Sequence, residues 1–223
     1  MVRVAAVSMV KNECDIIEWF IKLNARFVDH FYIIDHNSND GTDKILRRLE
    51  AGGAPITCTR AETVAFEQSR LTTEKVRAVA ATNEFDYIVL LDADEFLSTP
   101  EGGRLGDYLS KQVSSDQFGT MDWLTFCPVS DHYYDSDNPL YEYFRPRSFE
   151  PATFSKVILG NEFAKHCTVA AGNHSAKHKR YKNAGVALDL PLYHVPVRSS
   201  QQLIRKAILG DYATQLNTKK KKG

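Results

Sequence analysis

The amino-acid sequence predicts an α/β fold, with a mostly parallel sheet flanked by helices in a single domain. Through residues 1–100, short runs rich in β-branched residues alternate with amphipathic segments, and polar turns separate them. Parallel neighbouring strands need a crossover connection, usually a helix, so this alternation indicates parallel pairing. The length of 223 residues, with 43% hydrophobic and 25% charged residues, suits one globular domain with a sizeable core.

Four strands are expected in the first half of the chain. Their sequences are VRVAAVSMV, FYIID, ITCT and YIVLL, within residues 2–10, 31–35, 56–59 and 87–91. Polar residues follow the first, second and fourth of these strands. Because ligands bind beyond the carboxyl ends of parallel strands, we expect residues 9–13, 35–42 and 92–95 to meet at one edge of the sheet.

Three helices are expected between these strands. Residues 14–28 carry apolar side chains at helical spacing, and Asn12 is a candidate N-cap. A second helix begins near Thr42 and stops at Gly52, and a third covers about residues 67–82.

The pattern changes after Leu97. A short helix is expected within residues 102–109, strands within 121–129, 153–159, 167–171 and 187–195, and a closing helix from residue 199 with Leu203, Ala207 and Ile208 on one side. An aromatic-rich segment at residues 131–147 reads as a long loop. We expect residues 1–100 to form one half of a single domain and residues 101–223 to form the opposite wall of a cleft.

The composition disfavours several classes of protein. The formal net charge is zero, which argues against a nucleic-acid partner. The four cysteines are widely spaced without a CxxC pair, and no apolar run is long enough to cross a bilayer, so a cytoplasmic location with reduced thiols is expected. The basic tail at residues 219–223 leaves open peripheral association with the inner face of a membrane.

The tetrapeptide Asp92-Ala93-Asp94-Glu95 directly follows the fourth strand. If the chain stays extended, Asp92 and Asp94 lie on one side while Ala93 turns away. Two carboxylates at the mouth of such a sheet suit Mn²⁺ or Mg²⁺, which complete their shells with water and substrate phosphates. The alternative is that these acids only mark where the strand reaches solvent.

Three motifs in order resemble glycosyltransferase family 2, whose members share the GT-A fold. They are VSMVKNECDIIEWF, YIIDHNSNDGT and YIVLLDADEFL, and together they span about the first hundred residues. In the second half, AGNH and YHVPVRSSQQLIRK resemble later segments of a bacterial branch of that family more loosely. The resemblance implies a GT-A type, Rossmann-like sheet and the transfer of a sugar from a nucleoside-diphosphate donor to a saccharide or lipid-linked acceptor, with inversion.

The resemblance also implies roles for individual residues. The nucleoside of the donor, with a UDP-sugar expected, would be held by Val10, Lys11, Asn12, Glu13 and Asp35. Asp92, with Ala93 beside it, would contact the ribose or the metal shell, and Asp94 would bind the metal. Where many family members have two adjacent acids and then a glycine, this chain has Asp35, His36 and Asn37, which leaves the nucleobase open.

Histidine and arginine candidates come from the second half of the chain. GT-A enzymes often complete the metal shell with a late histidine, for which His194 is the first candidate and His174 the second; a structural role is the alternative for each. Arg198 is the preferred diphosphate ligand, because arginine binds phosphate in a bidentate manner. The other basic candidates, most of them expected to be solvated, are Lys156, Lys177, Lys179, Arg205 and Lys206.

The catalytic base is the least defined part of the site. An inverting transferase needs a carboxylate near the acceptor hydroxyl. Asp131 and, behind it, Glu162 are the candidates, with loop capping as the alternative for Asp131. The runner-up functions are a catalytically silent nucleotide- or sugar-binding module, a DxD phosphohydrolase and a sugar nucleotidyltransferase, although the latter two fit the position of the motif and the first loop less well.

Overall fold

The structure of the chain is a computed structural model that describes residues 1–61, 67–128, 144–146 and 154–208. Its strands are β1 (Val4–Val10), β2 (His30–Asp35), β3 (Ile56–Arg60), β4 (Tyr87–Leu90), β5 (Glu95–Phe96), β6 (Phe118–Pro128), β7 (Phe144–Pro146), β8 (Ser155–Gly160), β9 (Thr168–Val169), β10 (Ala176–Lys177), β11 (Gly185–Ala187) and β12 (Leu192–His194). Its helices are α1 (Ile17–Asn24), α2 (Thr42–Ala51), α3 (Gln68–Ala81), α4 (Leu105–Gln112), α5 (Asn161–Ala164), the 3₁₀ turns η1 (Pro100–Gly102) and η3 (Ala171–Asn173), and a helix over residues 200–208.

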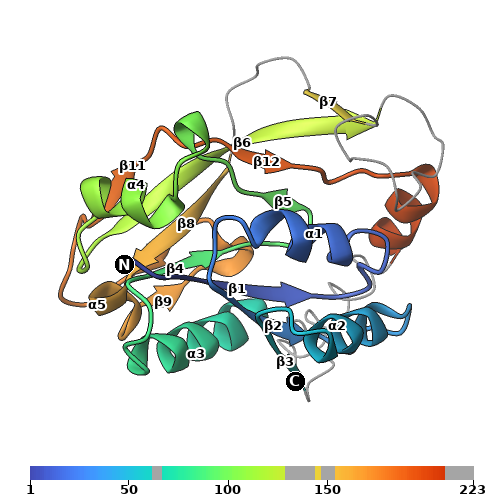
Figure 1. Ribbon diagram of the computed structural model, residues 1–223, viewed down its shortest axis with the longest axis horizontal. Coiled ribbons are helices and arrows are strands. Elements are labelled where there is room, and N and C mark those ends of the chain that lie inside the picture. Colours follow the sequence, from blue (N-terminus) through green and yellow to red (C-terminus); the bar gives the residue numbers. More distant parts are fainter. Residues whose placement is uncertain (62–66, 129–143, 147–153, 209–223) are drawn as a thin grey trace, which may run out of the picture.

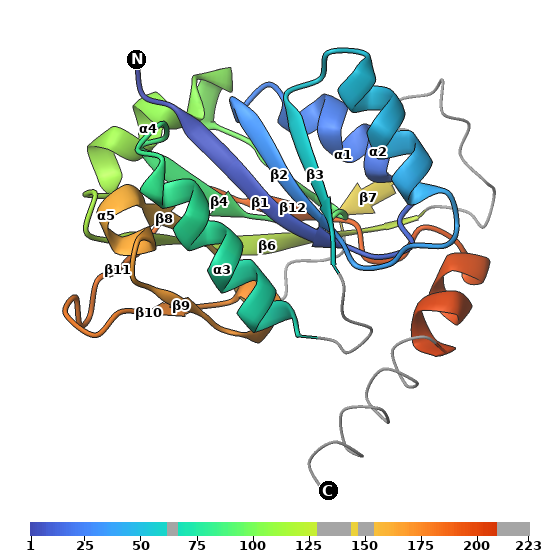
Figure 2. The same cartoon turned by 90° about the horizontal axis from the view of Figure 1, so that it is seen from below.

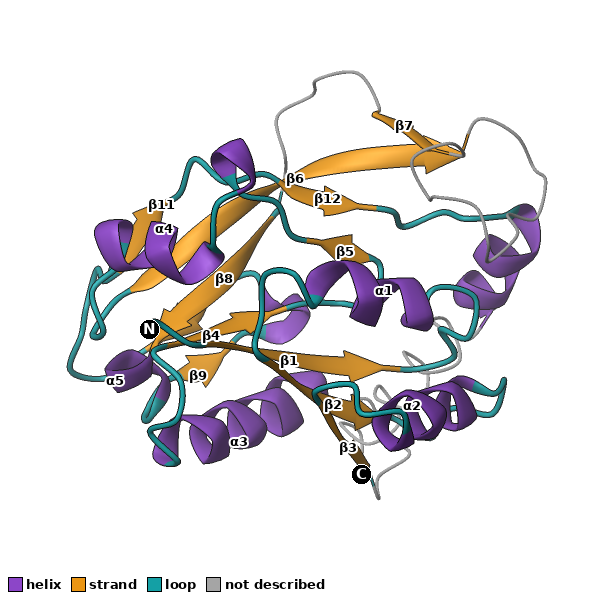
Figure 3. Cartoon of the chain, viewed as in Figure 1, coloured by secondary structure: helices purple, strands orange, loops and turns teal. Residues whose placement is uncertain are grey.

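One mixed sheet dominates the fold, in the strand order β3-β2-β1-β4-β8-β6-β12-β5 (Figures 1 and 3). The first four strands pair in parallel, as the alternation of strands and helices predicted. Strands β7 and β11 also pair with β6, and β9 and β10 form a separate antiparallel pair. The expected α/β fold class is confirmed.

Helices cover both faces of the sheet, with α1 and α2 on one side and α3 on the other (Figure 2). Alternate residues of β1 enter two different cores. Val4 and Ala6 pack in the cluster that contains Phe20 of α1 and Leu46 of α2, whereas Ala5 belongs to the cluster with α3. Burial on both faces explains why this strand is apolar at every position except Ser8.

Strand β8 runs antiparallel to both β4 and β6, so it starts where β4 ends. Ile158 pairs with Val89, and Lys156 at the start of β8 therefore lies next to the chain that leaves β4. The sheet then continues from β6 to β12 in parallel and from β12 to β5 antiparallel. This route returns the second half of the chain to the carboxyl edge of the first four strands.

Two local expectations are wrong. Helix α1 begins after Ile16 with no side-chain cap, and Asn12 instead adopts a left-handed conformation with φ of 57°. The strand expected over residues 187–195 is split into β11 and β12 by a segment that contains Pro191, which has no N–H to donate to a strand neighbour. The helix at residues 200–208 forms, but Leu203 and Ile208 are exposed rather than buried.

Among the described residues, none of the helices combines the length and the low polarity that a bilayer-spanning segment requires. The basic tail at residues 219–223 and most of the aromatic-rich segment lie outside the described residues.

Candidate active site at the carboxyl edge of the sheet

The loops that follow β1 and β2 interlock at the carboxyl edge of the sheet. The backbone N–H of Asn12 donates to Ser38 Oγ at 2.9 Å, and that of Glu13 donates to Thr42 Oγ1 at 2.8 Å. Asp35, which is buried, accepts the N–H of Ser38 at 3.0 Å. The two loops expected to hold a nucleoside are therefore tied to each other before any ligand arrives.

The acidic motif turns instead of remaining extended. The N–H of Glu95 donates to the carbonyl of Asp92 at 3.1 Å, and the N–H of Asp92 donates to Glu95 Oε2 at 2.8 Å. The extended geometry expected for residues 92–94 is therefore wrong. The turn brings the side chain of Glu95 back beside Asp92, while Asp94 meets different neighbours.

Asn24, at the end of α1, holds the strand that follows this turn. Its buried amide donates to the carbonyl of Glu95 at 2.9 Å and accepts the N–H of Leu97 at 2.8 Å. With β5 fixed in this way, antiparallel pairing with β12 places His194 directly opposite Glu95. The backbone of the site is thus set by a helix and by a strand that is distant in sequence.

Asp94, Glu95 and His194 form a group that could hold a metal ion, with one potential ligand atom from each within 4.8 Å of the others. Asp94 is 3% exposed and Glu95 is fully buried. His194 Nδ1 is a buried atom that makes no hydrogen bond within the described part of the chain, and Glu95 Oε1 has the ammonium of Lys156 3.3 Å away. Buried polar atoms are normally satisfied, and two carboxylates with an imidazole are a donor set that suits Mn²⁺, so these residues fit a divalent cation.

Lys156 lies between the first and last acids of the motif. Its ammonium is 2.5 Å from Asp92 Oδ2 and 3.3 Å from Glu95 Oε1, and the lysine is fully buried. Asn173 Nδ2 donates to the other oxygen of Asp92 at 3.3 Å. Burial and the charge of Asp92 hold the pKa of Glu95 well above its usual range, although Lys156 opposes the shift.

Three basic side chains, different from Lys156, lie close to Asp94. Lys206 Nζ lies 2.9 Å from its Oδ2, Arg198 NH1 lies 3.7 Å from the same oxygen, and His194 Nε2 lies 3.8 Å from Oδ1. Burial alone would raise the pKa of Asp94, but the charges of Lys206, His194 and Arg198 hold it below its usual range. Asp94 is therefore an ionised carboxylate in the folded chain.

Arg198 joins the first loop to the end of the second half. The guanidinium contacts Glu13 at 2.5 Å and Asp15 at 2.7 Å, and the residue is only 2% exposed. Burial raises the pKa of Glu13 to about 7 in spite of the opposing charge of Arg198, and the nearby charges of Asp94 and Asp15 add to this rise. With its donors engaged by two carboxylates, Arg198 positions the Glu13 loop.

An aromatic cluster borders the site. The ring of His194 stacks on Trp123 with centroids 4.0 Å apart, and His174 stacks on Phe154 at 4.7 Å. His174 also uses its Nδ1 in a contact of 2.9 Å with the carbonyl of Ser155. Burial lowers the pKa of His194 despite the nearby charge of Asp94, which favours the neutral imidazole that binds metals.

The structure gathers most of the residues that were singled out from the sequence at this one edge. They come from the β1 and β2 loops, the turn after β4, η3 and the segment after β12, and they are Val10, Lys11, Asn12, Glu13, Asp35, His36, Asp92, Ala93, Asp94, His174, His194 and Arg198. Glu162 is not among them, because α5 follows the end of β8 that pairs with Tyr87, at the opposite edge of the sheet. Its carboxylate is exposed and paired with Lys165, and Asp131 lies outside the described residues.

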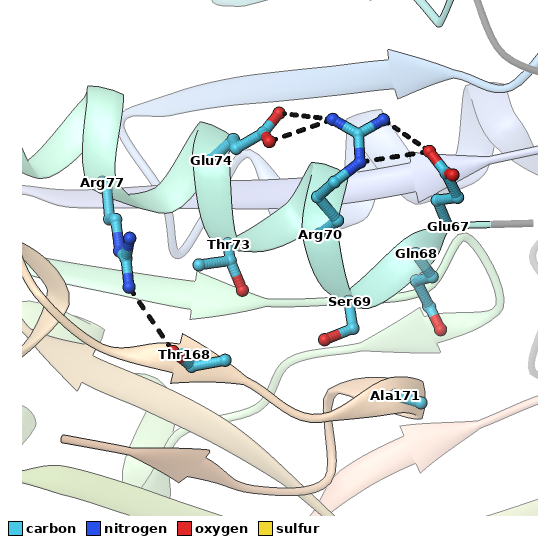
Figure 4. Close-up of a pocket in the computed structure, with 9 residues that line it drawn as sticks. All are labelled: Glu67, Gln68, Ser69, Arg70, Thr73, Glu74, Arg77, Thr168 and Ala171. Atoms are coloured by element: carbon cyan, nitrogen blue, oxygen red, sulfur yellow. Dashed lines mark hydrogen bonds and ion pairs between the residues drawn. The ribbon is translucent and has the colours of Figure 1, made fainter. Parts of the chain in front are cut away.

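A surface hollow of about 590 Å³ lies between helix α3 and the segment that carries Thr168 and Ala171 (Figure 4). It is bordered by the start of α3 and by residues 168–171. Gln68 accepts the N–H of Gly172 at 3.0 Å, so α3 supports this segment. Both arginines of the hollow are already engaged, since Arg70 pairs with Glu67 and Glu74 and Arg77 donates to the carbonyl of Cys167.

Three contributors to the site have no distinctive sequence signal. Lys156 was one basic candidate among several, and Asn24 and Asn173 were not singled out. Each acts through long-range contacts: Lys156 is 64 residues from Asp92, Asn173 is 81 residues from it, and Asn24 is 71 residues from Glu95. A buried polar position within an apolar helical pattern is the one signal that could have identified Asn24.

No protein-family model matches the chain, and no curated protein sequence matches it. Solved structures do match its fold. S. aureus TarS 1-349 in complex with UDP-GlcNAc has a TM-score of 0.52 at 10% identity over 90% of this chain. GalNAc-T7 with UDP, GalNAc and Mn²⁺ has a TM-score of 0.51 at 9% identity, also over 90% of this chain.

The chain spans 60% of that TarS structure and 45% of the GalNAc-T7 structure. At this level of identity the similarity concerns the fold. The chain has a GT-A fold, as the three sequence motifs implied.

Proposed function

We propose that the protein is a metal-dependent glycosyltransferase that moves a sugar from a nucleoside-diphosphate donor to an acceptor hydroxyl, with inversion. The observation that carries this proposal is the convergence of Asp94, Glu95 and His194 at the carboxyl edge of a GT-A fold, beside the interlocked loops after β1 and β2. Ligands of open α/β sheets bind at this edge.

Mn²⁺ or Mg²⁺ is the proposed cofactor, held by Asp94, Glu95 and His194. A bound cation neutralises the nucleoside diphosphate as it leaves, which is Lewis-acid assistance to the leaving group. Asp92, one of whose oxygens is engaged by Lys156 and the other by Asn173, serves in the proposal as a ribose or metal-shell contact. His174 is the weaker metal candidate, because its Nδ1 already contacts a backbone carbonyl.

Residues 1–100 supply the proposed donor half of the domain. The loop Val10 to Glu13 and the end of β2 at Asp35 and His36 would hold the nucleoside, with a UDP-sugar as the expected donor. Support for this comes from the hydrogen bonds that already join these loops, since a preformed site loses less entropy on binding. Arg198 orients Glu13 in this arrangement.

Residues 101–223 supply the proposed acceptor half, for a saccharide or a lipid-linked acceptor. Trp123, on strand β6, stacks on His194 of the proposed metal site, and β6 ends at Pro128. Asp131 follows three residues later in the sequence and is the proposed catalytic base. We propose a cytoplasmic location, with the basic tail as a contact for the inner face of a membrane if the acceptor is lipid-linked.

The test is a panel of nucleotide sugars with and without Mn²⁺, read by thermal shift and by release of nucleoside diphosphate. Asp94→Asn should abolish the metal-dependent shift and the release, whereas Asp107→Asn, on an exposed position of α4, should leave both intact. The proposal fails if no nucleotide stabilises the chain in a metal-dependent manner.

Two other outcomes would assign the site differently. Stabilisation without turnover on any acceptor would favour a binding module. Release of inorganic phosphate in place of nucleoside diphosphate would favour a phosphohydrolase.

A further inference from the structure

Asp94, a carboxylate proposed to bind the metal, is already paired with a positively charged side chain. Lys206 Nζ lies 2.9 Å from Asp94 Oδ2 and donates a hydrogen bond to it. Asp94 is 3% exposed, and the ammonium of Lys206 shares the compensation of this buried negative charge with Arg198, whose NH1 lies 3.7 Å from the same oxygen. Lys206 belongs to the helix at residues 200–208, which lies 112 residues beyond Asp94 in the sequence.

The two positively charged side chains near Asp94, Arg198 and Lys206, differ in their freedom to move. Arg198 has a 1% exposed side chain and is bound to Glu13 and Asp15, so it is fixed. Lys206 has a 50% exposed side chain, and Asp94 is its ion-pair partner. A lysine also carries its charge on a flexible four-carbon stem. Lys206 is therefore the cation that can leave Asp94.

The helix that carries Lys206 is itself lightly anchored. Leu203, Ile204 and Ile208 are 47%, 60% and 65% exposed, so they bury little apolar surface against the domain. Gln202 ties the start of the helix to the preceding segment, where its side chain accepts the N–H of Arg198 and donates to the carbonyl of Pro196. A displacement of Lys206 thus needs no rearrangement of the core.

A divalent cation held by Asp94, Glu95 and His194 would compete with the ammonium of Lys206 for the same carboxylate group. Two cations on one carboxylate would repel each other strongly. Once displaced, the half-exposed ammonium of Lys206 would remain near Asp94, where a metal-bound donor would bring its diphosphate. Lysine binds phosphate as a point charge, so the diphosphate would be a new partner of opposite charge.

We propose that Lys206 competes with the metal for Asp94 and moves onto the donor diphosphate when the metal binds. This inference rests on the proposed function, because it concerns the same site. It assigns to Lys206 a donor-binding role in addition to its ion pair with Asp94. It also makes metal and nucleotide binding cooperative, since each relieves a cost of the other.

The test separates metal binding from nucleotide binding, with Lys206→Met as the variant and Lys111→Met, on an exposed position of α4, as the matched control. Mn²⁺ affinity is measured by electron paramagnetic resonance without nucleotide, and UDP affinity by calorimetry in saturating Mn²⁺. Lys206→Met should bind Mn²⁺ about fivefold more tightly, because a half-exposed competing ion pair is removed, and UDP about tenfold more weakly. Lys111→Met should change neither value.

The outcomes distinguish this inference from the proposed function. If Lys206→Met leaves Mn²⁺ affinity unchanged or weakens it, while Asp94→Asn abolishes Mn²⁺ binding, the role of Lys206 is wrong and the metal site stands. If Mn²⁺ affinity rises but UDP affinity is unaffected, the transfer to the diphosphate is wrong. If neither the wild-type chain nor any variant binds Mn²⁺ or UDP, the proposed function is overturned and this inference falls with it.

Discussion

Asp92 and Asp94 are two residues apart in one motif, yet each is neutralised in a different way. Asp92 faces Lys156, which is fully buried on strand β8 and also contacts Glu95. Asp94 faces Lys206, whose side chain is half-exposed on the helix at residues 200–208. The Asp92–Lys156 pair therefore involves a strand of the sheet, whereas the Asp94–Lys206 pair involves a helix with exposed side chains.

The difference separates a structural ion pair from an exchangeable one. Removing one partner of a buried pair leaves an uncompensated charge, whereas an exposed partner can be replaced by water or by another ion. The predictions below test this contrast, starting with the largest expected effect.

Lys156→Met should lower the free energy of unfolding by about 3–5 kcal/mol, because Asp92 and the fully buried Glu95 would lose their shared cation. Urea denaturation at pH 7 measures this change. The exposed control Lys111→Met should stay within about 0.5 kcal/mol of the wild-type chain. Equal losses for Lys156→Met and Lys206→Met would remove the distinction between the two pairings.

Asn24→Ala should lower the free energy of unfolding by about 2–4 kcal/mol, because the carbonyl of Glu95 and the N–H of Leu97 would both lose a buried hydrogen-bond partner. Asn24→Leu restores most of the volume without the hydrogen bonds, so it separates packing from polarity. Denaturation curves in which Asn24→Leu matches the wild-type chain would show that the acidic turn is held by other contacts.

Glu13→Gln should change how stability depends on pH. The folded chain keeps the proton of Glu13 up to a pKa of about 7, whereas the ordinary value is 4.5. Between these values the native state binds the extra proton, so this group stabilises the fold at low pH and that contribution is lost as the pH rises to 7. The free energy of unfolding should fall by at most about 3 kcal/mol from this cause.

The measurement for Glu13 is a set of denaturation curves from pH 5 to pH 7.5. In Glu13→Gln, the free energy of unfolding should fall less between pH 5 and pH 7.5 than it does in the wild-type chain. Glu18→Gln, which removes an exposed carboxylate paired with Lys22 and Arg48, should not have this effect. A decline that persists unchanged in Glu13→Gln would show that another group is responsible.

Lys206→Met should have the smallest effect on stability, at most about 1 kcal/mol, because its side chain is half-exposed. The effect should shrink further in 0.5 M salt, because salt screens the attraction between solvent-exposed charges. A loss as large as that of Lys156→Met, or one that salt does not reduce, would show that Lys206 is structural.

The first half of the chain was predictable because its signals are local. The polar turns after β1, β2 and β4 are contiguous with strands whose apolar runs are unmistakable, and parallel pairing then places their carboxyl ends together. His194 was also chosen from its sequence neighbours. Its place opposite Glu95 depends on the register between β5 and β12, which are separated by about a hundred residues and are only two and three residues long.

Polar residues inside the second half were harder to predict. Lys156 sits in an otherwise apolar strand, where its burial depends on two acids contributed by another part of the chain. The tight turn of the acidic motif was also missed, because it is accompanied by contacts with distant residues, such as the hydrogen bond of Asn24 to the carbonyl of Glu95. Such contacts follow from tertiary structure and leave no periodic trace in the sequence.

Strand β8 enters the sheet from the side of the site, since its first residue is Ser155 and it runs away from the carboxyl edge. Insertions or deletions ahead of Ser155 should therefore leave the pairing of β8 with β4 and β6 in register. Sequence variation at this position is consequently a way to alter the acceptor preference of the proposed transferase while the sheet stays intact.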